Sequence, residues 1–333
     1  MRLFLLPVST RRALIYCEKL HEKAATERGY LDKLTTKASE TWVAWESDAK
    51  APLNWKKRVA HMGNQALNRI PFEEWGLKTL PALTPRRKLA ITEGTEKWQV
   101  IYPGRYLHKE RVPEILKQLA LEKQAMYRSK MLWSIVAMPL TVPFVLIPII
   151  PNLPFFYLVY RAYSYWKALA GSKHLEFLLQ HNLPTPNPST QLDEAYTAGL
   201  MYPTRHISRA APTPNKEQSE KVANVVESLT NGGQEDVMVL QRWNGKLIAE
   251  QFHLPDMEVE IERAVDQVEQ SIEAKDKLVQ ERLELEKATA EPGQTAKDVL
   301  PKHVTQPLEE AEKRIHEAAE KMSHERPAKD EKA

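Results

Sequence analysis

The chain has 333 residues, of which 42% are hydrophobic and 27% are charged, and its formal net charge is +3. This length allows two or three domains. A single cysteine, Cys17, excludes a disulfide within the chain. Basic residues are concentrated before residue 131, but they are interspersed with acidic ones and accompany no recognised nucleic-acid-binding motif. We therefore expect no nucleic acid partner.

Residues 1–105 predict a small α+β domain. The apolar run at residues 2–6 predicts a strand, and the alternating run at 97–102 predicts a second strand that pairs with it. Between them we expect three helices, at about 10–28, at about 32–48 and after Pro52. The start of the chain is rich in arginine and poor in acidic residues. That pattern is compatible with a mitochondrial targeting signal and equally with an ordinary basic N-terminus.

A thirty-residue run without charge, Met131 to Tyr160, dominates the middle of the chain. A helix crosses the apolar part of a bilayer in roughly 20 residues, so this length predicts a membrane-crossing segment. Five prolines and a turn at residues 151–154 favour a hairpin over residues 131–180, entered by a basic helix at 106–130. The second helix of the hairpin could return across the bilayer or lie in its interface. The expected fold class is thus a mostly α-helical membrane protein.

The second helix of this hairpin carries small and polar residues at three- and four-residue spacing. Five of them should fall along one helical face: Arg161, Ser164, Lys167, Gly171 and His174. We expect Arg161 to be a structural anchor rather than an ion ligand, because its guanidinium stays protonated. Gly171 should allow close helix packing. His174 and His181 lack cysteine or carboxylate neighbours at ligand spacing, so they predict no metal site.

The C-terminal part predicts a linker followed by helices. Prolines mark the linker at residues 181–215, and an acidic helical region follows at 216–290. Within it, four apolar residues are spaced by 4, 3 and 4 as in a coiled coil: Ile261, Val265, Val268 and Ile272. The pattern ends within three heptads, so a short amphipathic docking helix is the preferred interpretation. The charged tail at 291–333 predicts solvated helix or disorder.

Three stretches of the sequence are together similar to a known family. They read MRLFLLPVSTRRALIYCEKL at 1–20, IPFEEWGLKTLP at 70–81 and NLPFFYLVYRAYSYWKALAGSKHLEFLL at 152–179. The last stretch contains a distinctive pattern: Arg161, Ser164, Trp166, Lys167, Ala168, Leu169, Gly171, Ser172, His174 and Leu175. With these residues the chain resembles the mitochondrial K+/H+ exchange-related proteins of fungi and animals. The resemblance implies a mitochondrial inner-membrane protein with a role in potassium–proton exchange and matrix volume control. It carries no defined transport or catalytic residues.

Among function classes, an accessory subunit accounts best for the sequence. No phosphate-binding loop, paired-cysteine motif or hydrolase signature occurs, so we expect no enzyme and no catalytic, cofactor-binding or metal-binding residues. An exchanger needs ion ligands at membrane depth, and residues 131–160 contain no acidic, basic or histidine side chain. The alternative is an oligomeric pore-forming subunit of the exchanger.

The expected partners follow from this function and from the charge flanking the apolar run. They are membrane lipids and other inner-membrane proteins of the exchange system, and self-association is compatible with either function. Basic residues lie at both ends of the apolar run, which predicts that both terminal domains are in the matrix.

Overall fold

The fold is known from a computed structural model, which describes residues 1–18, 63, 65, 67, 69–141, 153–202, 204–230 and 235–289. The expected helices at 32–48 and after Pro52, most of the one at 10–28, and the tail at 291–333 lie outside these residues. The chain divides into two compact units, Met1–Ser271 and Ile272–Ala333. Of the second unit, the described residues form the end of one long helix. The first unit holds every site discussed below.

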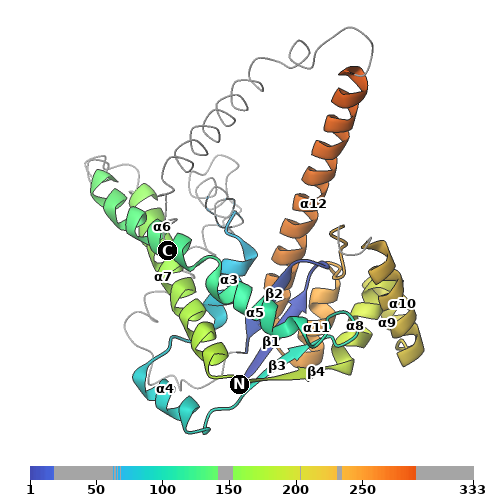
Figure 1. The fold of residues 1–333 in the computed structure, drawn as a ribbon, viewed down its shortest axis with the longest axis horizontal. Helices are drawn as coiled ribbons and strands as arrows, with labels where there is room; N and C mark the ends of the chain where they lie inside the picture. Colours follow the sequence, from blue (N-terminus) through green and yellow to red (C-terminus); the bar gives the residue numbers. More distant parts are fainter. Residues whose placement is uncertain are drawn as a thin grey trace, which may run out of the picture. The chain divides into compact units, whose positions relative to one another are not determined.

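A four-stranded mixed sheet lies at the centre of the first unit (Figure 1). Its strands are β1 (Arg2–Pro7), β2 (Ala13–Cys17), β3 (Trp98–Tyr102) and β4 (Pro184–Pro188). They stand in the order β2-β1-β3-β4, with β2 antiparallel to β1, and with β1, β3 and β4 parallel. The predicted pairing of the first strand with residues 97–102 is therefore confirmed.

Two segments form strands where the sequence predicted other structure. Residues 13–17 were expected in a helix, but a tight turn, closed by the hydrogen bond from the Val8 amide to the Arg12 carbonyl, returns them along β1. The proline-rich start of the expected linker forms β4 at the edge of the sheet, where prolines are tolerated because few donors are needed there. Helix α8 (Thr190–Met201) then buries Leu192 and Tyr196, so this segment belongs to the folded core.

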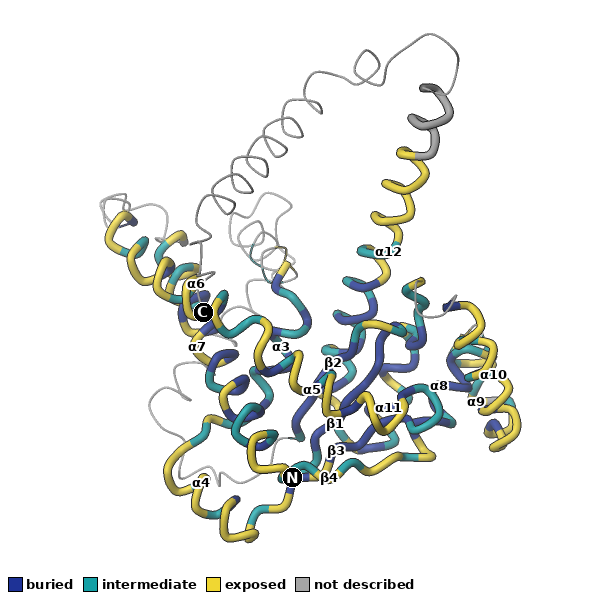
Figure 2. Tube along the Cα trace, in the orientation of Figure 1, coloured by how far each residue is buried: buried dark blue, intermediate teal, exposed yellow. Residues whose placement is uncertain are grey.

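Helices cover both faces of the sheet (Figures 1 and 2). The first face packs against α3 (Phe72–Thr79), α5 (Arg111–Leu121) and α7 (Leu153–Gln180) in one buried apolar cluster. The second face packs against α8, α11 (Asn244–Phe252) and the beginning of α12 (Pro255–Thr289). There the Phe252 and Phe4 rings meet edge to face, with centroids 5.0 Å apart. Because both faces are covered, β1 and β2 are continuous apolar runs rather than alternating ones.

The other helices are α4 (Pro85–Thr92), α6 (Gln124–Ala137), α9 (Arg205–Ala210) and α10 (Lys216–Leu229). Helix α6 packs along α7, and α10 packs against α8. Five apolar residues of α12 are buried in the first unit, and they include three of the four predicted coiled-coil positions: Met257, Ile261, Ala264, Val265 and Val268. A coiled coil is therefore not supported, because these side chains already pack within the chain. The first half of α12 is a docking helix.

The prediction of a mostly α-helical membrane protein with a transmembrane hairpin is wrong. Among the described residues, no helix combines the length and the apolar character that a bilayer crossing requires. Within the described part of the uncharged run, residues 131–137 end α6 and residues 153–160 begin α7. Helix α7 is long, but it continues through charged residues at 161, 167, 173 and 176. The fold is instead a mostly helical protein built around a small mixed sheet.

Candidate functional site

Helix α3 lies between the sheet and α7, and it is held there by three contacts with α7 that recur along the helix. A carboxylate of α3 binds Arg161, the Leu77 carbonyl abuts Gly171, and the Pro81 carbonyl accepts a hydrogen bond from His174. The residues on the α3 side belong to the stretch 70–81, and those on the α7 side belong to the stretch 152–179. Two of the three stretches that are similar to the family therefore pack against each other.

Two glycines set the distances across this layer. At Gly76 an added Cβ would overlap the carbonyl oxygen of Ile15 in β2. At Gly171 it would overlap the carbonyl oxygen of Leu77. In both cases the obstacle is backbone, which cannot move aside as a flexible side chain could. Glycine is therefore required at both positions for α3 to pack between β2 and α7.

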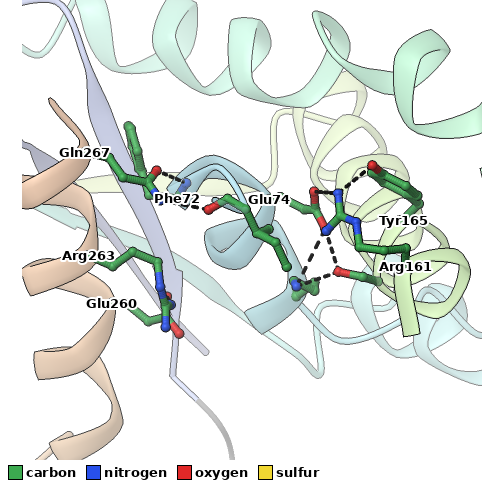
Figure 3. A network of polar contacts seen from close by, with 10 residues as sticks. Phe72, Glu74, Arg161, Tyr165, Glu260, Arg263 and Gln267 are labelled. Atoms are coloured by element: carbon green, nitrogen blue, oxygen red, sulfur yellow. Dashed lines mark hydrogen bonds and ion pairs between the residues drawn. The ribbon is translucent and has the colours of Figure 1, made fainter. Parts of the chain in front are cut away.

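A buried charge cluster lies at the centre of this contact (Figure 3). Arg161 donates to Glu74 through both terminal nitrogens, with Nη1–Oε1 at 3.1 Å and Nη2–Oε2 at 3.3 Å. The Ser164 hydroxyl donates to the same Oε1 at 2.5 Å. The Glu74 side chain is 1% exposed, so water contributes little to its solvation. A buried carboxylate of this kind is tolerated because its oxygens are paired and hydrogen-bonded.

A second cation shares this carboxylate. Lys78 lies one helical turn after Glu74 on α3, with its Nζ 3.7 Å from Oε1, and it donates to Ser164 Oγ at 2.7 Å. Burial, only partly offset by the charge of Glu74, lowers the pKa of Lys78 to about 8. For Arg161, burial opposes the charged form, but Glu74 and Tyr165 outweigh it and raise the pKa. Of the two cations in this cluster, Lys78 is therefore the one that releases its proton more readily.

The cluster is connected to α12 through Trp75. The Lys78 ammonium lies 3.5 Å from the centroid of the Trp75 ring, and the Arg263 guanidinium lies 4.3 Å from it. Gln267 of α12 accepts a hydrogen bond from the Phe72 amide at 2.9 Å and donates to the Ile70 carbonyl at 2.8 Å. Figure 3 shows α3 between α12 on one side and α7 on the other. Three elements distant in sequence therefore meet at one short helix.

His174 is a core residue rather than a ligand in the described structure. Its Nδ1 donates to the Pro81 carbonyl at 2.7 Å, since a carbonyl can only accept. Its ring meets the Trp98 ring edge to face, and burial lowers its pKa, which favours the neutral ring. Within the described residues, no three histidine, cysteine or carboxylate side chains are grouped as a metal site would require.

The structure describes all five residues of the predicted α7 face. Arg161, Ser164, Gly171 and His174 are buried toward the rest of the fold, whereas Lys167 is exposed. At 100° per residue Lys167 falls between Gly171 and His174, so helical spacing alone does not account for its exposure. Ala168, on the same side of the helix, is fully buried. Trp166, the sixth residue singled out by the sequence, is 51% exposed and lies apart from the cluster.

Sequence reasoning missed the α3 half of the site. The stretch 70–81 is part of the family resemblance, but the resemblance gives no role to Glu74 or Lys78. Their spacing of four residues is that of an intrahelical ion pair, which is the one signal available. That spacing does not show that Glu74 is buried, and the neighbouring Glu73 instead pairs with Lys123 at 3.1 Å.

Comparison with known proteins agrees with this pairing of stretches. The family described as mitochondrial K+-H+ exchange-related matches residues 2–179, which include the sheet strands β1 to β3, α3 and nearly all of α7. An uncharacterised protein of Schizosaccharomyces pombe is 30% identical over 198 residues, which cover 59% of this chain and 82% of that relative. An uncharacterised protein of Saccharomyces cerevisiae is 27% identical over 207 residues, which cover 54% of this chain and 63% of that relative. No solved structure matches the chain.

Proposed function

Because the chain belongs to the mitochondrial K+-H+ exchange-related family, whose role is related to that exchange in mitochondria, we propose that it is an accessory factor of potassium–proton exchange. It acts at the inner membrane and supports matrix volume homeostasis without itself conducting ions. Two features of the described structure support this proposal. They are the sealed charge cluster and the exposed apolar surface of α6 and α7.

The charge cluster is built to hold helices together rather than to pass ions. A potassium ion would need several free oxygen ligands that can replace its water shell. Both Glu74 oxygens already accept hydrogen bonds from Arg161, and Oε1 also accepts one from Ser164. The two nearby cations would repel a third. This arrangement favours a structural role for the cluster, in which it fixes α7 and, through α7, the orientation of α6.

Helix α6 and the first half of α7 carry many exposed residues (Figure 2), several of them large and apolar. On α6, Trp133 is 71% exposed and Val136 62%, and on α7, Phe156 is 61% exposed and Trp166 51%. Soluble proteins rarely expose so many large apolar groups on neighbouring elements without a binding partner. Tryptophan and tyrosine side chains are suited to the boundary between headgroups and acyl chains.

The charge around this surface favours anionic lipid as its partner. Residues 123–175 contain six lysines and arginines and no acidic residue. Basic side chains beside an apolar surface are attracted to anionic headgroups within a Debye length. We therefore propose that α6 and α7 contact the lipid surface of the inner membrane. We further propose the matrix face, because basic segments tend to stay on the side that is not translocated.

Vesicle flotation tests the lipid contact. The full-length protein should float with phosphatidylcholine vesicles that contain anionic phospholipid and much less with pure phosphatidylcholine. Replacing Trp133 and Phe156 together by serine should reduce flotation several-fold, because each side chain supplies roughly 2 kcal/mol on transfer from water. The matched control replaces Val225 and Val259, which are 57% and 54% exposed on α10 and α12, by serine. Equal flotation of both double variants would contradict the proposed surface.

Swelling of isolated mitochondria tests the function. In potassium acetate medium the matrix takes up salt and water only as fast as potassium exchanges for protons. Mitochondria that lack this protein should swell more slowly, and re-expression of the wild-type chain should restore the rate. The Trp133→Ser/Phe156→Ser variant should not restore it, whereas the control double variant should. Unchanged swelling in the absence of the protein would refute a role in exchange.

A further inference from the structure

A cavity of about 610 Å³ lies at one end of the sheet, away from the charge cluster. Thr10 and Arg11 line it shortly after the end of β1, and Arg105, Tyr106 and His108 line it shortly after the end of β3. Helix α10 supplies another wall, with Val226 among its lining residues. The volume is in the range of sites for small organic ligands, about 300 to 1,000 Å³.

The position of this cavity is the one at which sheets with parallel strands bind ligands. β1 and β3 are neighbouring parallel strands, so their carboxyl ends meet at one edge (Figure 1). From β1 the chain continues to β2 on one side of the sheet, and from β3 it continues by way of later helices to β4 on the other side. The cavity is lined by the turn that joins β1 to β2 and by the segment that follows β3. Ligands of sheets with parallel strands commonly bind outside the carboxyl ends of such strands.

Charge determines which ligands this crevice would accept. Among the lining residues, the basic ones are Arg11, Arg105, His108 and Arg111, and the acidic one is Glu227. Arg105 is held in place by an ion pair with Glu220, and its backbone amide donates to Asp193 Oδ1 at 3.0 Å. Arg111 and His108 are exposed at the rim, where their side chains can turn toward a bound group. Arginine forks match the oxygens of phosphate groups.

The rest of the lining is apolar or aromatic. Val226 and Val239 lie on one side, and Tyr106 is fixed by a hydrogen bond of 2.8 Å between its hydroxyl and Thr197 Oγ1. A bare inorganic ion would leave these surfaces unused. We infer that this cavity is a binding site for a phosphate-bearing small molecule of nucleotide size, whose phosphate lies against the arginines and whose organic part lies against Tyr106 and the two valines. This site is independent of the proposed function in ion exchange.

Calorimetric titration of the full-length protein tests this inference, with ATP, ADP and inorganic phosphate as the probes. The nucleotides should bind, and inorganic phosphate should bind at least about tenfold more weakly because it makes no apolar contact. Arg111→Gln and His108→Gln should each weaken nucleotide binding at least about fivefold, because an amide reproduces neither the guanidinium fork nor the placement of the imidazole nitrogens. The matched control is Arg128→Gln, which removes the same charge from an exposed position on α6 outside the cavity. It should change the affinity less than about twofold.

Four results would overturn the inference. The first is that neither ATP nor ADP binds detectably at about 1 mM, because a site weaker than this would not recognise a nucleotide. The second is unchanged affinity in the Arg111→Gln and His108→Gln variants. The third is an equal loss of affinity in Arg128→Gln, which would show attraction to net charge rather than to this cavity. Inorganic phosphate binding as tightly as ATP would also contradict a nucleotide-sized ligand.

Discussion

Glu74 and Arg161 are 87 positions apart in the sequence, yet their side chains form a bidentate ion pair in the interior of the fold. The pair joins the short helix α3 to the long helix α7 at the point where α7 leaves the sheet. The pair makes the docking of α3 against α7 specific, because an unpaired charge in this position would be strongly unfavourable. Any other register between α3 and α7 would separate the two charges.

The first prediction concerns the geometry of this ion pair. Arg161→Lys should destabilise the protein by about 1 to 3 kcal/mol, because a lysine cannot make two parallel hydrogen bonds to Glu74. Arg161→Met should cost about 3 to 5 kcal/mol, since it leaves a buried carboxylate with too few partners. Urea unfolding measures both. Lys173→Met, an exposed change on the same helix, is the control and should have little effect. Wild-type stability in Arg161→Lys would show that only the charge matters.

The second prediction concerns Gly171. Gly171→Ala should destabilise the protein by about 2 kcal/mol or more, because the new methyl group would overlap the Leu77 carbonyl. Ala168→Gly removes a buried methyl group from the same face and should cost only about 1 kcal/mol. Gly171→Leu should be worse than either change. Thermal unfolding of the three variants checks this order, and a Gly171→Ala protein as stable as wild type would disprove the close approach of α7 to α3.

The third prediction follows from the lowered pKa of Lys78, about 8 against 10.5 for an ordinary lysine. Between these two values the unfolded chain binds the proton and the folded chain does not, so unfolding becomes less favourable as pH rises. The free energy of unfolding of wild type minus that of Lys78→Met should therefore increase from pH 7 to pH 10, by on the order of 3 kcal/mol at most. Subtraction cancels the other titrating groups. A flat difference would mean that Lys78 titrates normally.

The fourth prediction has the opposite sign and concerns Asp193. Burial, opposed by the Arg105 amide, raises the pKa of Asp193 to about 6 from 3.8. The contribution of this group to stability is complete below pH 3.8 and is lost as pH rises through 6. At pH 7 the Asp193→Asn variant should therefore be at least as stable as wild type. At pH 4 its stability relative to wild type should be lower than at pH 7. Melting curves from pH 4 to pH 7 measure this difference. A variant whose stability relative to wild type is lower at pH 7 than at pH 4 would contradict the prediction.

The fifth prediction concerns the C-terminal limit of the fold. A chain ending at Ser271 should fold, because it retains the contacts of Gln267 and of the buried α12 residues with the first unit. A chain ending at residue 215 should not fold stably, because it loses Phe252 and its contact with β1. Dispersion of the amide signals in NMR spectra distinguishes the two results. A well-folded chain 1–215 would show that α11 and α12 are dispensable.

The sequence predicted local features of this fold better than its long-range contacts. The first strand and the burial of Arg161, Ser164, Gly171 and His174 on α7 agree with the apolar run and the helical spacing. The pairing of the first strand with residues 97–102 is a long-range contact that the apolar pattern also predicted. The exposure of Lys167 does not follow from helical spacing, because at 100° per residue it lies between Gly171 and His174. The role of Glu74 could not be predicted, since its partner is distant in sequence and Glu73 has the same chemistry.

The membrane prediction was wrong for a related reason. A window of apolar residues does not show where helices begin and end, and the described residues 131–137 and 153–160 of this run belong to two different helices, α6 and α7. The prolines of the expected linker predicted an end to regular secondary structure. At the edge of a sheet, however, proline is compatible with a strand, as in β4. In both cases the local pattern was present and its tertiary context determined the structure.

Reconstitution of exchange in proteoliposomes tests the central claim most directly. Inner-membrane extracts from mitochondria that lack this protein are incorporated into vesicles with a potassium gradient, and proton movement is followed with a pH-sensitive dye. We predict slow exchange with the depleted extract, restoration when the purified protein is added, and no exchange with the purified protein alone. Potassium–proton exchange by the purified protein alone would contradict an accessory role and would identify the chain as the exchanger itself.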